Sequence, residues 1–324
     1  MSEKLRWGII CTAGIAVDRL IPAMQASSNG EVVAIGSRKL EKAQDAAHKL
    51  GIHKAYGSYQ EVLDDAEVDA VYNPLPVSMH AEWSIKAMEA GKPVLCEKPL
   101  TVRREEALLM EQAAQENDVR LAEALMYRYH PLTRKVLEMI RDGAIGELRV
   151  LESEFNVDIK DGDIRLRRET GGGAVLDLGV YCISILRHMA GEEPDAIHAV
   201  GSLNDEQVDI STSAALHFPS GVVGHMACCL RSAFNCCYSA TGTGGRILVD
   251  HGAMVAWPGE AFKIKYWHGD EYEEIETPEA DPYQLLVEDF ADAVLNNRQP
   301  RFAFEDTLAN LEVSDKILTD VGYF

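Results

Sequence analysis

Apolar strand-like segments alternate with helix-like segments over the first 125 residues, and this alternation restricts the fold more than any other feature of the chain. The helix-like segments include residues 40–50, 81–90 and 103–117, and the strand-like segments are residues 5–11, 31–36, 69–73, 94–96 and 119–124. Such alternation predicts an α/β fold with a doubly wound parallel sheet of Rossmann type. In sheets of this kind, ligands bind outside the carboxyl ends of the strands.

The pattern changes near Met126. A helix-like segment over residues 131–142 precedes a series of strand-like segments, and Pro219-Ser220-Gly221 is typical of a hairpin turn between two of them. These strand-like segments are residues 148–157, 196–203, 210–218, 222–230, 236–240, 247–249 and 264–267. We therefore expect a dinucleotide-binding Rossmann domain in residues 1–125. Residues 126–324 should form a substrate-binding and dimerisation α/β domain with an open, mostly antiparallel sheet. Its apolar alternation predicts an outer face covered by a partner, hence a homodimer or a dimer of dimers.

Charge and cysteine content narrow the class of protein. The formal net charge of −21 would repel phosphate backbones, so no nucleic-acid partner is expected. No window approaches the length of a membrane span and no signal-peptide pattern is present, so we expect no membrane association and a cytoplasmic location. The seven cysteines fit reduced thiols. Neighbouring strand residues point to opposite faces, so Cys228-Cys229 and Cys236-Cys237 predict no metal site.

Two strand ends carry residues suited to a dinucleotide. After the first strand, Thr12-Ala13-Gly14-Ile15 stands where a glycine-rich turn is usual, and its small residues still let a pyrophosphate approach the backbone amides. After the second strand, Ser37-Arg38 replaces the acid that holds the ribose of NAD. A guanidinium pairs with a 2′-phosphate, so we predict NADP as the cofactor, with NAD as the alternative.

Charged and polar residues also mark two later segments. The strand over residues 94–96 ends abruptly in Glu97-Lys98-Pro99, which places an acid and a base at a strand tip. In the second domain, Asp177 and Tyr181 follow three consecutive glycines and, four residues apart, share one helical face.

Taken in order and spacing, these segments resemble the Gfo/Idh/MocA oxidoreductases over nearly the whole chain. With a tyrosine at position 181, the chain resembles the branch of the family that holds sugar dehydrogenases, glucose–fructose oxidoreductase and dimeric dihydrodiol dehydrogenase. Cys11, Ala13 and Ala16 depart from the family's glycines. The matching segments are Trp7-Gly8-Ile9, Gly36-Ser37-Arg38, Asn73-Pro74-Leu75-Pro76 with His80, Cys96-Glu97-Lys98-Pro99-Leu100, Met126 to Pro131, Gly171 to Tyr181 and Asp281-Pro282-Tyr283.

The resemblance implies that Lys98 and Tyr181 face the nicotinamide and form the acid–base pair, with Asp177 binding substrate hydroxyls or orienting Lys98. A cation about 4 Å from a tyrosine contributes up to ~4 kcal/mol at an effective dielectric near 20, which brings a tyrosinate near neutral pH. Arg165 would reach the cofactor or substrate, or be only a loop charge. The implied cofactor-binding residues are Thr12, Ala13, Gly14, Ile15, Ser37, Arg38, Asn73, Pro74, Leu75, His80, Glu97, Lys98, Arg128 and Arg165.

The predicted function is an NADP-preferring oxidoreductase. It would transfer a hydride between the nicotinamide and a secondary or anomeric hydroxyl of a sugar or related polyol, as D-xylose and glucose dehydrogenases do. Alternative activities are reduction of a keto-sugar and oxidation of trans-dihydrodiols. A non-catalytic regulator that senses the dinucleotide is a further class, although it would not need both Lys98 and Tyr181. In a rival assignment, His80 or His130 accepts the proton of the substrate hydroxyl in place of Tyr181.

Overall fold

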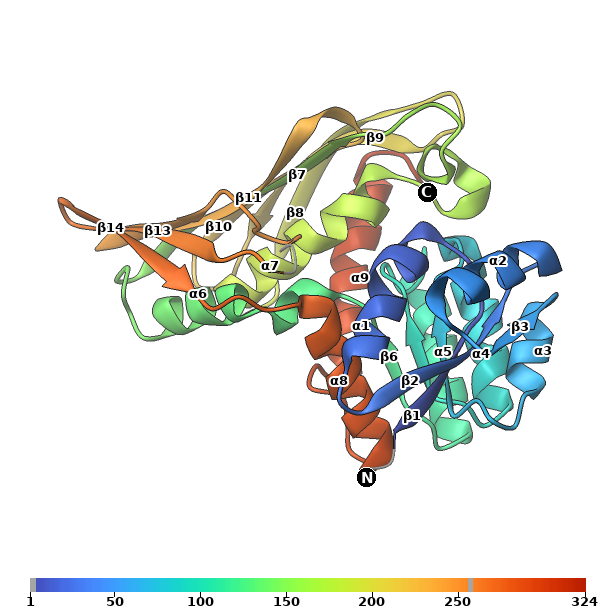
Figure 1. Ribbon diagram of the computed structural model, residues 1–324. Coiled ribbons are helices and arrows are strands. Elements are labelled where there is room, and N and C mark those ends of the chain that lie inside the picture. The colour runs from blue at the N-terminus through green and yellow to red at the C-terminus, as the bar shows by residue number, and fades with distance from the viewer. Residues whose placement is uncertain (1–3, 256–258) are drawn as a thin grey trace. The chain divides into compact units, whose positions relative to one another are not determined.

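The computed structural model describes residues 4–255 and 259–324, and the chain divides into two units (Figure 1). The first unit contains Met1–Met126 and Tyr283–Leu308, and the second contains Tyr127–Pro282 and Ala309–Phe324. The sequence division at residue 125 gave no reason to join helix α8 (Pro282–Leu295) to the first unit. Packing explains it, because the rings of Trp7 and Phe290 lie 5.4 Å apart and Asn29 Nδ2 donates to the Glu288 carbonyl.

Six parallel strands form the sheet of the first unit, in the order β3-β2-β1-β4-β5-β6. This confirms the doubly wound parallel sheet. The strands are β1 (Leu5–Ile9), β2 (Gly30–Gly36), β3 (Lys54–Tyr56), β4 (Ala70–Asn73), β5 (Val94–Cys96) and β6 (Leu121–Glu123). The helices are α1 (Ile21–Ala26), α2 (Leu40–Leu50), α3 (Tyr59–Asp64), α4 (His80–Glu89) and α5 (Arg104–Glu116), with a π-helical turn over Ala16–Leu20 and a 3₁₀ turn over Val77–Met79.

Strand β3 and helix α3 occupy a stretch for which the sequence analysis predicted no element. Ser58 begins α3, because its Oγ accepts the backbone N–H of Glu61 at 3.2 Å and donates to the Glu61 carboxylate at 2.8 Å. Helix α3 packs tightly on the sheet, since a Cβ at Gly36 would lie only 2.7 Å from Val62 Cγ2. The strands are parallel, so the carboxyl ends of β1, β2, β4 and β5 all lie at one edge, and the strand order reverses between β1 and β4.

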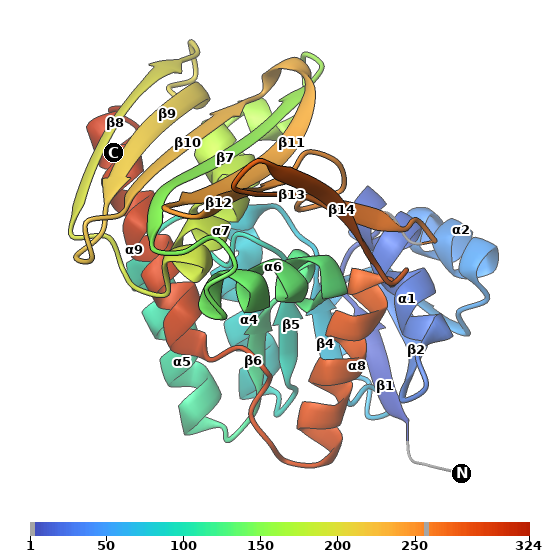
Figure 2. The ribbon, with the colours of Figure 1, turned by 90° about the vertical axis from the view of Figure 1, so that its left-hand side faces the viewer.

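The second unit contains the mostly antiparallel sheet that the sequence predicted, in the order β14-β13-β12-β11-β7-β10-β9-β8, with β10 and β7 as its parallel pair (Figure 2). Its strands are β7 (Leu148–Asp158), β8 (Ala196–Leu203), β9 (Asp209–His217), β10 (Val223–Cys229), β11 (Arg231–Gly242), β12 (Gly245–Val249), β13 (Phe262–His268) and β14 (Glu271–Thr277). Its helical elements are α6 (Pro131–Arg141), α7 (Val180–Ala190) and α9 (Phe304–Asp320, which begins in the first unit), with short turns over Met126–Tyr129, Ile164–Leu166, Arg168–Thr170 and Val175–Gly179.

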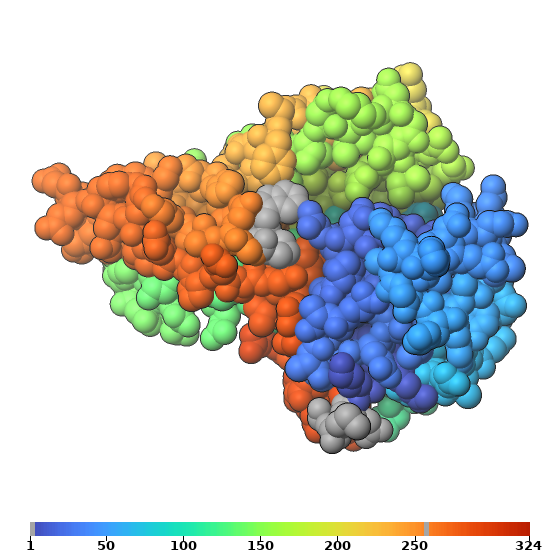
Figure 3. Space-filling model, viewed as in Figure 1, coloured from blue at the N-terminus to red at the C-terminus, as the bar shows by residue number. Residues whose placement is uncertain are grey.

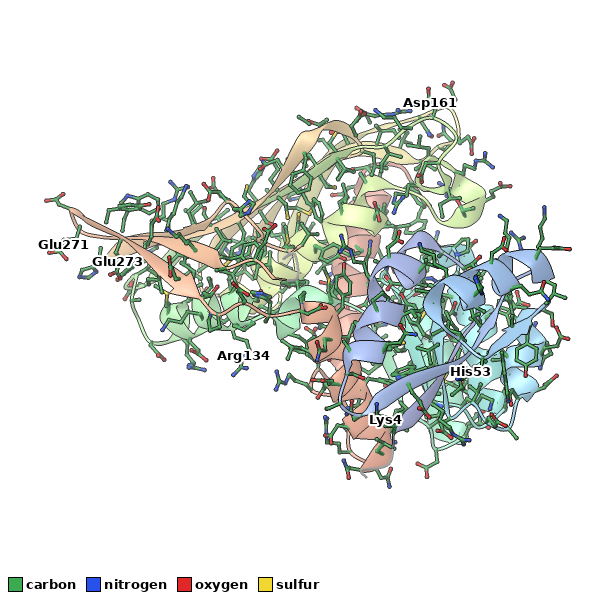
Figure 4. All side chains as sticks on the ribbon, in the orientation of Figure 1. Lys4, His53, Arg134, Asp161, Glu271 and Glu273 are labelled. Atoms are coloured by element: carbon green, nitrogen blue, oxygen red, sulfur yellow. The ribbon has the colours of Figure 1, made fainter. Side chains whose placement is uncertain are left out.

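Strand β14 is the one strand of this sheet that the sequence analysis left out. The β13–β14 hairpin projects from the second unit in the space-filling view (Figure 3), and Glu271 and Glu273 stand at its tip (Figure 4). Its sequence, Glu-Tyr-Glu-Glu-Ile-Glu-Thr, is too acidic to resemble a buried strand. The pairing partner β13 holds it in the sheet, and Lys263 Nζ lies 2.9 Å from the Glu274 carboxylate across the two strands.

Helix α7 forms the core of the second unit. The helical segment Arg168–Ala190 is long and apolar enough to cross a membrane by length and composition, which corrects the expectation that no window approaches a span. The share of that window buried within the structure is 83%, so packing accounts for its apolar character. The helix lies against β7, β10 and β11 (Figure 2).

Candidate active site

The turn after β1 offers exposed backbone at the start of a helix. Thr12, Ala13 and Ile15 are half-buried and Gly14 is exposed. A Cβ at Gly14 would meet one neighbour, Asp18 Oδ2, at 3.8 Å, so the space above the turn is open. The first N–H groups of a helix have no partner within the helix and attract anions. These residues therefore fit a pyrophosphate although Cys11, Ala13 and Ala16 replace the family's glycines.

The end of β2 presents a cation to solvent. Ser37 is buried, whereas the Arg38 side chain is exposed, and the sequence from 37 to 40 contains no acid. Beneath Arg38 lie the Cys11 thiol and the Tyr59 hydroxyl. Burial raises the pKa of both groups, and the nearby Arg38 guanidinium opposes that rise. Sequence analysis missed Tyr59 because it reaches this place from α3, and its ring is held edge-on by Trp83 at 5.0 Å. The exposed guanidinium fits the 2′-phosphate of NADP.

The loop after β4 is fastened by Asn73. Its Nδ2 donates to Ser84 Oγ at 3.0 Å and to the His80 carbonyl at 3.2 Å, and its Oδ1 accepts the N–H of Leu75 at 3.2 Å. Asn73, Pro74 and Leu75 are all buried. The Asn73 side chain, expected to bind the cofactor, is thus used to shape the loop.

His80 links this loop to the turn that carries Lys98. The His80 Nε2 lies 2.7 Å from the Leu75 carbonyl, and Nδ1 lies 3.0 Å from the Pro99 carbonyl and 3.2 Å from the Leu100 carbonyl. The side chain is fully buried, and burial lowers its pKa. His80 therefore supports the turn, and because both ring nitrogens face backbone carbonyls, the geometry disfavours it as the acceptor of a substrate proton. Its assignment to the cofactor stays a prediction.

The turn after β5 presents one side chain. Lys98 is half-buried, whereas Cys96, Glu97, Pro99 and Leu100 are buried, and the Lys98–Pro99 peptide is cis. The Glu97 carboxylate accepts the Tyr72 hydroxyl at 2.5 Å and the Lys98 N–H at 3.3 Å. Burial raises the pKa of Glu97, and these hydrogen bonds oppose the rise. Glu97 therefore holds the turn from within, so that Lys98 is presented by a hydrogen-bonded turn. The assignment of Glu97 to the cofactor stays a prediction.

Helix α7 and the turn before it carry the polar residues of the second unit. The turn begins after Gly171 and Gly173, whose φ angles of 72° and 141° favour glycine. Arg165 Nε lies 2.9 Å from Asp177 Oδ2, and Arg165 Nη1 lies 3.2 Å from Asp163, so Arg165 is an orienting partner of Asp177. Tyr181 is 6% exposed, and its ring lies 5.9 Å from that of Tyr127 and 5.6 Å from that of Phe155.

Two further predicted residues lie inside the second unit. Arg128 is only 5% exposed, in the turn Met126–Tyr129. His130 caps α6 by accepting the Leu132 N–H at 3.0 Å, and burial lowers its pKa to about 4. The structure thus gives His130 a structural task and disfavours it as the proton acceptor.

Asp209 is a buried acid that sequence analysis missed. It comes from β9, and its Oδ2 accepts the Val175 N–H at 2.9 Å and the Thr212 hydroxyl at 3.0 Å. Burial raises its pKa to about 6. Asp209 therefore fixes the start of the helical segment that carries Asp177 and Tyr181, from a strand far along the chain. Within the described residues, no group of three His, Cys, Asp or Glu side chains is placed to hold a metal ion.

These features define a dinucleotide-binding oxidoreductase with a Rossmann unit and a separate open-sheet unit. Residues 5–125 match the model of the oxidoreductase family with an NAD-binding Rossmann fold, and residues 133–248 match that of the GFO/IDH/MocA C-terminal domain. The chain therefore belongs to the Gfo/Idh/MocA oxidoreductase family, as its motifs predicted.

Relatives with assigned activities cover most of the chain. D-xylose 1-dehydrogenase (NADP(+)) 2 from Haloferax volcanii is 36% identical, over 97% of this chain and 96% of its own. Trans-1,2-dihydrobenzene-1,2-diol dehydrogenase from Mus musculus is 36% identical over 70% of this chain and 69% of its own. The crystal structure of a 3-ketoreductase from Actinomadura kijaniata, in complex with NADP and TDP-benzene, matches with a TM-score of 0.94, 34% identity and 98% coverage of both chains.

Proposed function

We propose that this protein is an NADP-preferring oxidoreductase that transfers a hydride between the nicotinamide and a secondary or anomeric hydroxyl of a sugar or related polyol. The observation that carries the proposal is the turn after β5. Hydrogen bonds from Tyr72 to Glu97 and between His80 and the Pro99 carbonyl hold the residues on either side of Lys98, whose own side chain is half-buried. The relatives named for NADP-dependent xylose oxidation and for 3-ketoreduction support the substrate class and the cofactor.

The proposed chemistry separates a hydride from a proton. When bound, the nicotinamide accepts the hydride in oxidation and returns it in reduction. Tyr181 accepts the hydroxyl proton, and Lys98 supplies the cation that lowers the tyrosine pKa from its usual value near 10 and stabilises the developing alkoxide. Asp177, oriented by Arg165, accepts hydrogen bonds from the remaining substrate hydroxyls.

The test is turnover of a sugar panel. Purified protein is mixed with NADP+ and D-xylose, D-glucose, D-galactose and glycerol, and NADPH formation is followed by absorbance. We expect oxidation of at least one aldose, with NAD+ giving lower kcat/KM. The Tyr181→Phe variant is the control, because it measures any reduction of NADP+ that occurs without the proposed base. Binding of NADP+ without turnover in either direction would overturn the enzyme proposal and favour a dinucleotide-sensing regulator.

A second candidate is reduction of a keto-sugar by the same residues in the reverse direction. The 3-ketoreductase from A. kijaniata, which covers 98% of this chain, specifically favours it. A higher kcat/KM with NADPH and a nucleotide-linked keto-sugar than with any aldose would assign the protein to that activity. Oxidation of a trans-dihydrodiol, supported by the mouse relative, is measured in the same panel.

We also propose that the enzyme is a cytoplasmic homodimer. All seven cysteines are free thiols, which fits a reducing compartment. The second sheet exposes valines on the face opposite α7, among them Val150, Val200 and Val223. Such a face is suited to burial against a second copy.

A further inference from the structure

Phe234 is an aromatic side chain that folding leaves in solvent. Its exposed fraction is 62%, which exceeds the 50% of Tyr272 on the β13–β14 hairpin. It lies in β11 between Arg231 and Asn235, where the register against β7 shifts. An irregularity of this kind re-aims a side chain, and such features are common next to active sites.

A row of rings joins Phe234 to Tyr181. The centroids of Phe234 and Phe155 lie 6.3 Å apart with the planes at 86°, and those of Phe155 and Tyr181 lie 5.6 Å apart at 65°. Phe155 is 4% exposed and Tyr181 is 6% exposed, so the row is buried at the proposed acid–base residue and open at Phe234. Phe234 is therefore the exposed end of an aromatic row whose buried end is the proposed acid–base residue.

A second set of contacts brings Asp177 to the same end of this unit. The Arg231 side chain, three residues before Phe234, donates to the Ile159 carbonyl at 2.6 Å and forms an ion pair with Asp161. The same loop continues to Arg165, which pairs with Asp177. Figure 4 places Asp161 at the end of the sheet away from Glu271. The rings connect Phe234 to Tyr181 through Phe155, and the loop that begins beside Arg231 leads to the partner of Asp177.

The Phe234 ring lies on the helix side of the sheet. Phe155 and Cys236, its neighbours on β7 and β11, are buried on the side that α7 covers. The face proposed for dimerisation is the opposite one, which carries Val200 and Val223. A second copy on that outer face would leave Phe234 in solvent.

We propose that Phe234 is a specificity-determining residue that stacks on the apolar C–H face of a pyranose ring. The inference rests on the proposed function and adds the shape of the substrate. A pyranose with equatorial hydroxyls presents axial C–H groups on each face, and these are attracted to the electron-rich face of an aromatic ring and lose contact with water against it. The Asp177 carboxylate binds hydroxyls at the edge of the sugar, so a ring that offers both an apolar face and a polar rim is selected over an acyclic polyol.

The test compares Phe234→Ala and Phe234→Trp with wild type, using D-xylose as the probe. We expect Phe234→Ala to raise KM for D-xylose about ten-fold, the loss of one aromatic contact. The kcat should stay within about three-fold, because Phe234 moves no proton. The KM for NADP+ and the Tm should not change, since the ring is exposed. Phe234→Trp should keep KM for D-xylose near the wild-type value, because the larger ring can also stack on the sugar. Leu109→Ala, a 57% exposed apolar residue on α5, is the matched control and should change nothing.

The outcomes separate this inference from the function on which it rests. Wild-type protein that neither oxidises a sugar nor reduces a keto-sugar overturns the proposed function. Wild-type protein that oxidises D-xylose while Phe234→Ala keeps the same KM overturns the stacking role alone. A variant with unchanged KM but a new sedimentation coefficient would assign Phe234 to a subunit contact instead. An equal rise of KM for D-xylose and NADP+ would mean a general disturbance of the site and would also contradict the proposal.

Discussion

His80 shows how much the chemistry of one residue depends on its partners. A neutral imidazole carries one N–H, yet both ring nitrogens of His80 face backbone carbonyls, from Leu75 on one side and from Pro99 and Leu100 on the other. Phenylalanine keeps an aromatic ring but removes the N–H, so the side of the site to which that N–H donates loses its donor, at a cost of about 1–3 kcal/mol. We predict that His80→Phe lowers Tm and kcat together, because the Lys98 turn loosens.

Thermal unfolding and steady-state kinetics measure that outcome. His48→Phe is the matched control, since His48 is exposed on α2. A His80→Phe variant with wild-type Tm and a raised KM for NADP+ alone would return His80 to the cofactor site.

Arg38 decides the cofactor in this proposal. The charge-assisted hydrogen bond to a 2′-phosphate contributes about 1.5–3 kcal/mol, so Arg38→Ala should raise KM for NADP+ by roughly ten-fold or more. The KM for NAD+ should barely move, because NAD+ has no such phosphate. Lys39→Ala, next in the same exposed turn, provides the comparison. If both constants rise alike in Arg38→Ala, the residue supports the loop and does not select the phosphate.

Tyr181 and Lys98 should act as one catalytic unit. Tyr181→Phe keeps the ring that packs on Tyr127 and Phe155, so Tm and NADP+ binding should survive. The kcat should fall about 10²–10⁴-fold, the usual contribution of acid–base catalysis. Lys98→Met should cost at least as much, and the double variant far less than the product of the two losses. Additive losses, or a Tyr181→Phe kcat within a few-fold of wild type, would remove the tyrosine from the mechanism.

At the scale of elements, Asp209 couples the helix start to pH. Its pKa rises to about 6 on folding, so the native state binds the proton more tightly than the unfolded state does. Stability from this group is therefore fullest below about pH 4 and is lost as pH rises through 6, a change of ~3 kcal/mol. Asparagine keeps an oxygen facing the Val175 N–H but does not titrate. We predict that Tm of wild type minus Tm of Asp209→Asn decreases from pH 4.5 to 7.5, and a constant difference would contradict the assignment.

The elements also show what sequence predicts well and what it does not. Apart from β3 and β14, the strands of both sheets and the turn at Gly221 follow from local periodicity and turn chemistry, and the motif order identified the family. The positions of α8, Asp209 and Phe234 depend on partners far along the chain, such as Trp7, Val175 and Phe155. Sequence placed Asn73, His80 and Glu97 near the site. It could not show that their side chains face inward, because hydrogen bonds with backbone carbonyls and buried hydroxyls leave no pattern in the amino-acid sequence.

At the scale of the whole molecule, the outer face of the large sheet should join two copies. The face opposite α7 carries rows of small and apolar residues across β8, β9 and β10, such as Val200, Ser213 and Ala227, and Val200 is 74% exposed. A chain with a net charge of −21 repels its own copies, so the surface that meets a second copy must be poor in acids, and these strands are.

We predict a dimer at micromolar concentration and a monomer for Val200→Glu, because the substitution places a carboxylate in an interface that typically removes about 800 Å² per subunit from water. Sedimentation velocity reports both masses. Leu109→Glu adds the same charge to an exposed apolar site of the first unit and should leave the dimer intact. The helix side of the sheet holds Tyr181 and Phe234, so a monomeric Val200→Glu protein should also keep its KM for D-xylose. A wild-type monomer, or a Val200→Glu dimer, would show that this face stays in solvent.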